Sequence, residues 1–106
     1  MVAHVVLFRP KPDITSPDRQ AMFDALEAAA TSIPSVRRFH IGTRVTHGAK
    51  YEQLMVEDYP FAAVIEFDDL PGLQEYLQHP THRSLGDLFY RLWEAGMVYD
   101  YEMGKL

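Results

Sequence analysis

The chain has 106 residues, with ten Lys and Arg against fifteen Asp and Glu and a formal net charge of -5 at pH 7. This length predicts one compact domain over residues 1–106 with a single core, and the negative charge argues against a nucleic-acid backbone as partner. The absence of cysteine excludes disulfides, a thiol nucleophile and thiolate metal ligands.

The first predicted strand is Val2–Phe8, which is dense in β-branched and aromatic residues and is ended by Pro10 and Pro12. One face carries Val2, His4, Val6 and Phe8, and the other carries Ala3, Val5 and Leu7. Because both faces are apolar, we expect the strand to be central in a sheet covered on both sides. The apolar run is shorter than the roughly 20 residues of a membrane span, so we expect a cytoplasmic protein without a membrane partner.

The first helix is predicted to start at Ser16, because serine caps free N–H groups and is followed here by Pro17 and Asp18. Apolar residues then recur at spacings of three and four until Pro34 ends the helix. They are Met22, Phe23, Leu26, Ala29, Ala30 and Ile33. The spacing predicts one apolar stripe that faces the sheet.

Two more strands are predicted around a long connection. Alternation over Val36–Val45 indicates the second strand, and Phe61–Phe67 is the third. The polar segment Thr46–Pro60 between them exceeds the usual length of a hairpin loop, so we expect it to be a lid or a contact segment.

Two consecutive helices separated by a proline are predicted next. Asp69 caps the first, which continues until Pro80 interrupts it, and Thr81 is expected to cap the second, which runs to about Glu94. Their apolar positions are Leu73, Tyr76 and Leu77 in the first helix and Leu85, Leu88, Phe89, Leu92 and Trp93 in the second.

The last predicted strand, Gly96–Glu102, completes the order βαββαβ. This order is typical of a ferredoxin-like α+β fold, in which a four-stranded antiparallel sheet has helices on one face. Ala3, Val5 and Leu7 would then be exposed on the opposite face of a monomer. We therefore expect a homodimer whose two sheets face each other.

Imidazole is the first reagent to consider, because the chain contains five histidines. His79 and His82 flank the proline break, which places His82 in the first turn of a new helix. The positive end of the helix dipole favours a neutral imidazole there, as a general base requires. The alternative is that His82 lies near solvent without a chemical role.

Tyr76 and His4 are the other candidate site residues. The phenol of Tyr76 lies on an apolar helix face, where it can hold a substrate oxygen or be a hydrogen-bonded core tyrosine. His4 needs a partner or a pocket in its apolar strand, whereas Asp100 is interpreted as a solvated strand-end charge. A metal site of His4, His79 and His82 is disfavoured, because the last two do not share a helix face at metal-ligand spacing. We expect neither a metal nor a cofactor.

Four stretches of sequence carry a resemblance to a known family. They are His4-Val5-Val6-Leu7-Phe8, Ile33-Pro34-Ser35-Val36, Tyr76-Leu77-Gln78-His79-Pro80-Thr81-His82 and Val98-Tyr99-Asp100-Tyr101-Glu102. Over nearly its whole length the chain resembles the stress-responsive α/β-barrel (Dabb) family of the dimeric α+β barrel superfamily. The resemblance implies a homodimer in which two sheets form a barrel.

Within that family the sequence is most similar to plant polyketide cyclases of the olivetolic acid cyclase type. This resemblance implies that His82 is the general base, that Tyr76 orients it or binds an oxyanion, and that His4 lines the same pocket. A tyrosine of the cyclase pocket falls here at about Leu26, and Thr46–Pro60 is longer, so the substrate does not carry over.

Three functions remain open. The first is a cofactor-free cyclase or isomerase of a polyketide-like or aromatic keto compound, in which His82 removes a proton next to a carbonyl and Tyr76 binds the enolate oxygen. The second is a non-catalytic stress-response or small-ligand-binding homodimer, and the third is a cofactor-binding monooxygenase of the same superfamily. The side chains expected to bind substrate are His4, Phe23, Leu26, Leu73, His79 and Leu92.

Overall fold

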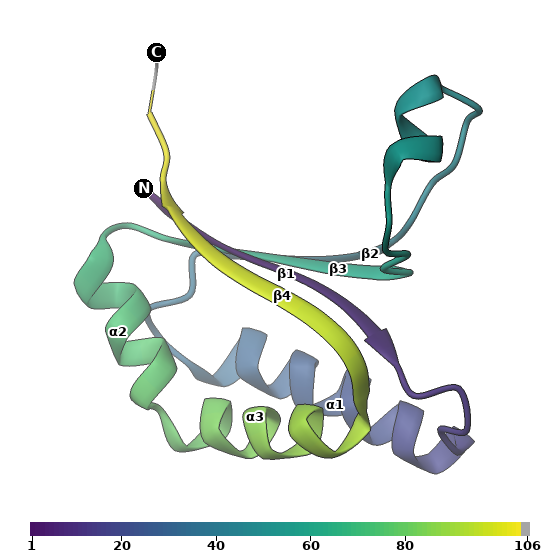
Figure 1. The fold of residues 1–106 in the computed structure, drawn as a ribbon. Coiled ribbons are helices and arrows are strands. Elements are labelled where there is room, and N and C mark those ends of the chain that lie inside the picture. Colours follow the sequence, from purple (N-terminus) through teal and green to yellow (C-terminus); the bar gives the residue numbers. More distant parts are fainter. Residues whose placement is uncertain (105–106) are drawn as a thin grey trace.

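The computed structural model describes residues 1–104, in which the strands and α-helices follow the predicted order and a short 3-10 helix that was not predicted lies in the connection Thr46–Pro60 (Figure 1). The elements are β1 (Val2–Pro10), α1 (Ser16–Ser32), β2 (Arg38–Thr43), the short 3-10 helix η1 (Lys50–Leu54), β3 (Phe61–Phe67), α2 (Leu70–Gln78), α3 (Pro80–Leu92) and β4 (Trp93–Glu102). The expected α+β, ferredoxin-like arrangement is confirmed.

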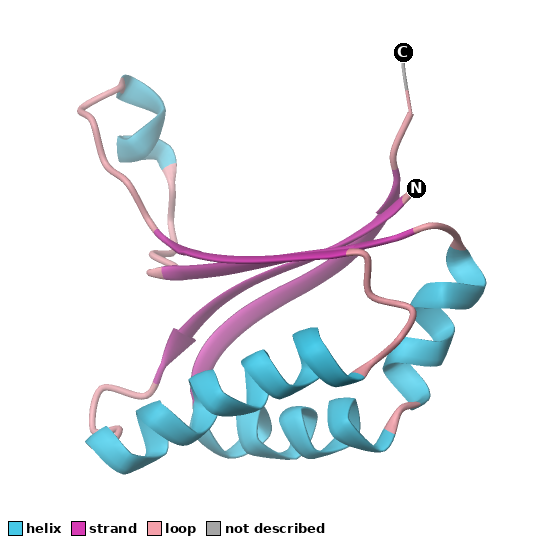
Figure 2. Cartoon of the chain, turned by 180° about the vertical axis from the view of Figure 1, so that it is seen from behind, coloured by secondary structure: helices cyan, strands magenta, loops and turns pink. Residues whose placement is uncertain are grey.

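The strands form one antiparallel sheet in the order β2-β3-β1-β4. Helices α1, α2 and α3 all cover the same face of this sheet (Figure 2). The register places His4 of β1 opposite Ile65 of β3 and Asp100 of β4. Residues that lie opposite one another point to the same face of an antiparallel sheet, so these side chains all face the helices.

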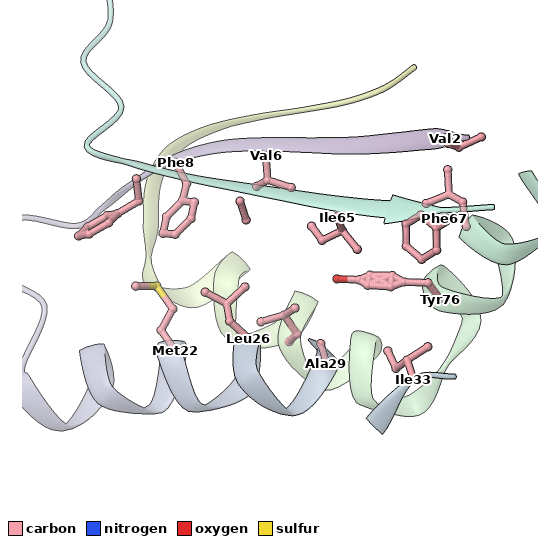
Figure 3. Close-up of a cluster of buried hydrophobic side chains, with 14 of the residues drawn as sticks. Val2, Val6, Phe8, Met22, Leu26, Ala29, Ile33, Ile65, Phe67 and Tyr76 are labelled. Atoms are coloured by element: carbon pink, nitrogen blue, oxygen red, sulfur yellow. The ribbon is translucent and has the colours of Figure 1, made fainter. Parts of the chain in front are cut away.

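The hydrophobic core lies between the sheet and the three helices (Figure 3). Phe8 is fully buried and stacks on Phe61, Phe89 and Trp93, with ring centroids 5.4, 5.5 and 5.0 Å away. This aromatic cluster joins β1, β3, α3 and the start of β4. It closes one end of the core, whereas Phe67 and Tyr76 pack at the other end.

Two of the predicted helix caps are wrong by one or two residues. The hydroxyl of Thr15, not Ser16, accepts the hydrogen bond from the Asp18 N–H at 3.2 Å. His79 Nδ1, not Thr81, accepts from the Thr81 N–H at 3.1 Å. Both segments carry neighbouring side chains able to cap, and the one with extended backbone just before the first turn is used. The Asp69 cap of α2 is confirmed.

Four predicted strand boundaries also differ. The first strand continues to Pro10 instead of ending at Phe8, and the second strand begins at Arg38 instead of Val36. The second strand ends at Thr43 instead of Val45, because Pro60 beside it has no N–H to extend the ladder. The last strand starts at Trp93 instead of Gly96, so Trp93 and Glu94 belong to β4 and not to the preceding helix. The helix ends at Leu92, and Trp93 has the extended backbone dihedral angles of a strand.

The outer face of the sheet, which is the face turned away from α1, α2 and α3, remains largely apolar. By register its apolar part, over β1, β4 and most of β3, carries Ala3, Val5, Leu7, Ala62, Val64, Met97, Tyr99 and Tyr101, whereas Glu66 of β3 and Arg38 and His40 of β2 add polar groups at one side. Tyr99 and Tyr101 are each 53% exposed, and no helix of the described residues 1–104 covers them (Figure 1). In the same part of the chain, no helix combines the length and apolar character needed to cross a membrane.

The aromatic cluster predicts a large effect of truncating Phe8. Replacing Phe8→Ala should lower the free energy of unfolding by about 3–5 kcal/mol, because it removes a fully buried ring and leaves a cavity. Urea unfolding followed by circular dichroism measures this loss. Tyr90→Ala is the control, since Tyr90 is 92% exposed; equal losses for both variants would contradict the packing described.

Candidate active site

A cavity of about 460 Å³ lies between the sheet and the helices, with a wall that is mostly apolar. Val6, Leu26, Ala63, Ile65 and Leu85 are among its apolar lining residues. The lining residues whose side chains contain polar atoms are His4, Tyr76, His82, Tyr90, Trp93 and Glu94. The cavity therefore combines an apolar interior with a small number of groups able to bind a proton or an oxygen.

His4, Tyr76 and His82 form a row along this wall. The Tyr76 ring lies between the two imidazoles, with its centroid 5.7 Å from that of His4 and 4.6 Å from that of His82, both in edge-on contacts. Tyr76 comes from the last turns of α2, and His82 comes from the first turn of α3. The break at Pro80 turns the chain so that these two side chains meet.

His4 is held by a carboxylate that the sequence analysis assigned to solvent. His4 Nδ1 lies 2.5 Å from Asp100 Oδ1, and the His4 side chain is 6% exposed. Because an ionised carboxylate only accepts hydrogen bonds, Nδ1 carries the hydrogen, and Nε2 remains for another partner. The interpretation of Asp100 as a merely solvated charge is wrong: the β1–β4 register places it directly opposite His4.

The surroundings of His82 favour its neutral form. Its pKa is lowered from the ordinary value of 6.5, mainly by burial and secondly by repulsion from His4, while a hydrogen bond to the Leu77 backbone opposes the shift. Burial penalises the charged imidazolium because the ring loses contact with water. His82 is therefore an uncharged proton acceptor near neutral pH.

The surroundings of Tyr76 keep its phenol protonated. Tyr76 is 1% exposed, and burial raises its pKa to about 12. Figure 3 shows the phenol oxygen directed along the core beneath Ile65. A buried phenol of this kind acts as a hydrogen-bond donor to an oxygen in the cavity.

Trp93 forms an aromatic part of the cavity wall. Its ring stacks on Phe8 at an interplanar angle of 7° and on Phe89 at 26°. It also lies against Gly96, where an added Cβ would come within 2.4 Å of the Trp93 ring. The indole Nε1 is buried and has no hydrogen-bond partner among the described residues. A residue predicted as ordinary core thus shapes the cavity.

Glu94 lies next to Trp93 on the cavity wall and is fixed by a cation. Arg9 Nε donates to Glu94 Oε2 at 2.9 Å. Arg9 is the last residue before the register shift between β1 and β4. No local sequence signal indicates this pair, because 85 residues separate its members.

The remaining predicted binding residues lie in different places. Leu26 lines the cavity. Phe23, Leu73 and Leu92 do not line the cavity, and they pack in or against the hydrophobic core instead. His79 is also outside the lining, because its ring caps α3. The lining residues that the sequence analysis missed include Phe89, Tyr90, Glu94 and Val98. These residues line the cavity because α3 and β4 lie close to β1. To identify them from the sequence, the strand register would have to be known.

The histidines do not gather into a cluster suited to a metal. Within residues 1–104, no group of three or more His, Cys, Asp or Glu side chains is placed to hold a metal ion. The arrangement instead offers a neutral acceptor in His82, a donor in Tyr76 and a carboxylate-bound imidazole in His4. These groups suit proton transfer at carbon next to a carbonyl.

Comparison with protein families matches residues 2–103 to the stress responsive A/B barrel domain. Among curated proteins, the chain is 26% identical over 104 residues to the olivetolic acid cyclase of Cannabis sativa, covering 98% of each chain. Among solved structures, a hydroxynitrile lyase from Passiflora edulis has a TM-score of 0.84 at 14% identity, covering 99% of this chain and 94% of that one. A dimeric protein of unknown function and ferredoxin-like fold from Bacteroides fragilis has a TM-score of 0.68 at 25% identity, covering 96% and 95%.

The burial of His82 predicts the direction of its titration. The imidazole should titrate below 6.5 in the folded chain, as followed by the NMR shift of its ring Cε1–H, with His82→Gln identifying the resonance. Because the unfolded chain retains the ordinary pKa, it binds the proton first as the pH falls. The contribution of His82 to stability is therefore complete above the unfolded pKa and is lost as the pH falls through the folded pKa. A midpoint at or above 6.5 would contradict this environment.

Proposed function

Since the chain belongs to the stress responsive A/B barrel (Dabb) family, we propose that it is a cofactor-free cyclase or isomerase that acts on a polyketide-like or aromatic keto compound. The observation that carries the proposal is the contact between a neutral His82 and a protonated Tyr76 on the wall of one cavity. A base and a donor side by side are what removal of a proton next to a carbonyl requires.

In the proposed reaction, His82 takes a proton from the carbon next to the substrate carbonyl. The C–H bond breaks, and its electron pair forms the double bond of an enolate, whose oxygen accepts a hydrogen bond from Tyr76. The proposed acceptor is the ring nitrogen of His82 that does not interact with the Leu77 backbone. After the carbon skeleton has rearranged or closed, the imidazolium returns the proton to the product.

His4 has a binding role in this proposal. Asp100 fixes the Nδ1 side of its ring, and the edge-on contact with Tyr76 would bring Nε2 of His4 close to the polar end of a substrate bound by Tyr76. With the ring hydrogen on Nδ1, Nε2 is an acceptor, and a hydrogen bond to it from a hydroxyl or enol group of the substrate would hold the carbonyl in one orientation while His82 reaches the adjacent carbon. His4 and Tyr76 therefore position the substrate, and His82 performs the proton transfer.

The shape of the cavity supports an elongated substrate with one polar end. His4 and Phe8 lie four residues apart on the same face of β1, which corresponds to about 13 Å along a strand. Trp93 stacks on Phe8 at the second position. A polar group at His4 would therefore leave an aromatic or alkyl portion of the same molecule directed toward Trp93.

A second candidate function is the binding of a small aromatic ligand without turnover. The observation that favours it is the mainly apolar wall of the cavity, which accommodates such a molecule whether or not His82 moves a proton. Binding and proton transfer must therefore be measured separately.

We also propose that the functional unit is a homodimer formed through the outer face. Two exposed tyrosines and Met97 lie on that face beside the apolar residues of β1. The Bacteroides fragilis relative is described as dimeric. Closing two such faces against each other would bury apolar surface that a monomer leaves in water.

The proton-transfer proposal is tested with phenylacetone, an aromatic ketone small enough for the cavity. The protein should bind it with a change in the fluorescence of Trp93, the only tryptophan, and should accelerate hydrogen–deuterium exchange next to the carbonyl in NMR. His82→Gln should lower the exchange rate by about 10²-fold or more while fluorescence binding persists. Tyr76→Phe should also slow exchange, because the enolate oxygen loses its donor.

The matched control is His79→Asn, which removes an imidazole outside the cavity and retains a good helix cap. It should exchange phenylacetone at the rate of the unmodified protein. Binding without accelerated exchange by the unmodified protein would favour the ligand-binding function. Equal exchange by the unmodified protein and His82→Gln would contradict the assigned base.

The homodimer is tested by sedimentation equilibrium. The unmodified chain should sediment as a dimer, and Tyr99→Asp should shift it toward monomer, because a carboxylate would be buried in an apolar interface without a partner. A monomer at all accessible concentrations would contradict the homodimer. Circular dichroism of Tyr99→Asp checks that the fold is retained.

A further inference from the structure

The segment Thr46–Pro60, here called the arm, exposes an unusual amount of apolar surface. Leu54, Met55 and Val56 are 74%, 54% and 94% exposed, and Tyr51 is 57% exposed. Three consecutive large apolar side chains in water are a feature of interaction surfaces. The arm therefore requires an explanation beyond its role as the connection between β2 and β3.

Hydrogen bonds fix the conformation of the arm. The Glu52 carboxylate accepts from the N–H groups of His47 and Gly48, with a closest distance of 2.7 Å to Gly48. Tyr51 Oη lies 2.7 Å from His47 Nε2. Gly48 has a φ of +86°, which suits the glycine at this turn. The exposed apolar side chains are thus presented by an ordered segment.

Ion pairs fix the base of the arm to the sheet. Arg9 Nη1 donates to Glu57 Oε2 at 3.0 Å and to the Asp58 carbonyl at 2.8 Å. Arg44 Nη1 donates to Asp58 Oδ1 at 2.7 Å. The acidic residues on both sides of Leu54–Val56 are therefore engaged within the chain, and the outward surface between them is apolar.

The direction of the arm excludes a lid over the cavity of its own chain. The arm rises from the end of the sheet on the side of the outer face, away from α1, α2 and α3 (Figures 1 and 2). The cavity lies on the opposite side of the sheet, and within residues 1–104 no arm residue is among those that line it. Of the two expected roles, lid or contact segment, the geometry favours contact.

We propose that the arm clasps a second copy of this chain, as a second contact region of the homodimer. This inference rests on the proposed homodimer. A second sheet packed on the outer face would occupy the layer into which the arm projects, so Leu54, Met55 and Val56 would lie against its edge. Under two-fold symmetry each arm makes this contact once, so the interface contains it twice.

A second copy fits the chemistry of the surface better than a charged partner. The arm contributes tyrosine, leucine, methionine and valine, and the outer face contributes Met97, Tyr99 and Tyr101 on the same side of the sheet. Aromatic residues and methionine are enriched in the interfaces of protein dimers. Because the arm is already ordered by its internal bonds, little conformational entropy is lost when it binds.

The test is a double variant, Leu54→Asp with Val56→Asp, studied by sedimentation equilibrium. Its dimer dissociation constant should rise by about tenfold or more, because two carboxylates would be desolvated at the interface. The control is Leu70→Asp, which places one such carboxylate on a 54% exposed leucine at the start of α2. This control should dissociate like the unmodified chain, and circular dichroism checks the fold of every variant.

The outcomes separate the arm from the homodimer itself. If Tyr99→Asp dissociates the dimer and the arm variant does not, the clasp is wrong and the homodimer stands. If the unmodified chain is monomeric, both are wrong. Hydrogen–deuterium exchange gives an independent reading: peptides from residues 50–56 should exchange more slowly when the unmodified chain is concentrated from monomer to dimer, and unchanged exchange there would overturn the clasp.

Discussion

Strand β1 is the constraint on which the rest of the molecule depends, because it lies in the middle of the sheet and is apolar on both faces. One face is covered by the chain itself: Val2, Val6 and Phe8 pack against the helices. On the opposite face, Val5 and Leu7 are only partly buried by neighbouring strands. The covered face contains the cavity, and the partly buried face belongs to the proposed dimer. One strand thus separates the chemistry of the chain from its assembly.

Two interruptions of regular packing shape the wall of the cavity. Pro80 divides one helical stretch into α2 and α3, which brings His82 against Tyr76. Gly96 has no side chain, so the Trp93 ring lies against the strand backbone where a Cβ would collide with it. The first interruption supplies the polar end of the cavity, and the second supplies its aromatic wall.

Local sequence signals were sufficient for the order of elements, for β3 over Phe61–Phe67 and for the Asp69 cap. They also placed His82 in the first turn of α3 next to Tyr76, because the proline break is a local event. The pairing of His4 with Asp100 could not be found in this way, since 96 residues separate the partners and only the β1–β4 register joins them. The same applies to Trp93, whose surroundings come from β1, α3 and β4. The caps by Thr15 and His79 were missed because neighbouring side chains compete for the same N–H groups.

The hydrogen bonds of Arg9 restrict which residue type can occupy position 9. Its Nε binds Glu94 on the cavity wall, while its Nη1 binds Glu57 and the Asp58 carbonyl at the base of the arm. A guanidinium presents several donors in a planar fork, whereas lysine carries all its donors on one ammonium nitrogen. Lysine would preserve the charge at position 9 and lose this two-sided geometry. The edge of the cavity and the base of the arm therefore share a single structural support, and arginine is the residue type that provides it.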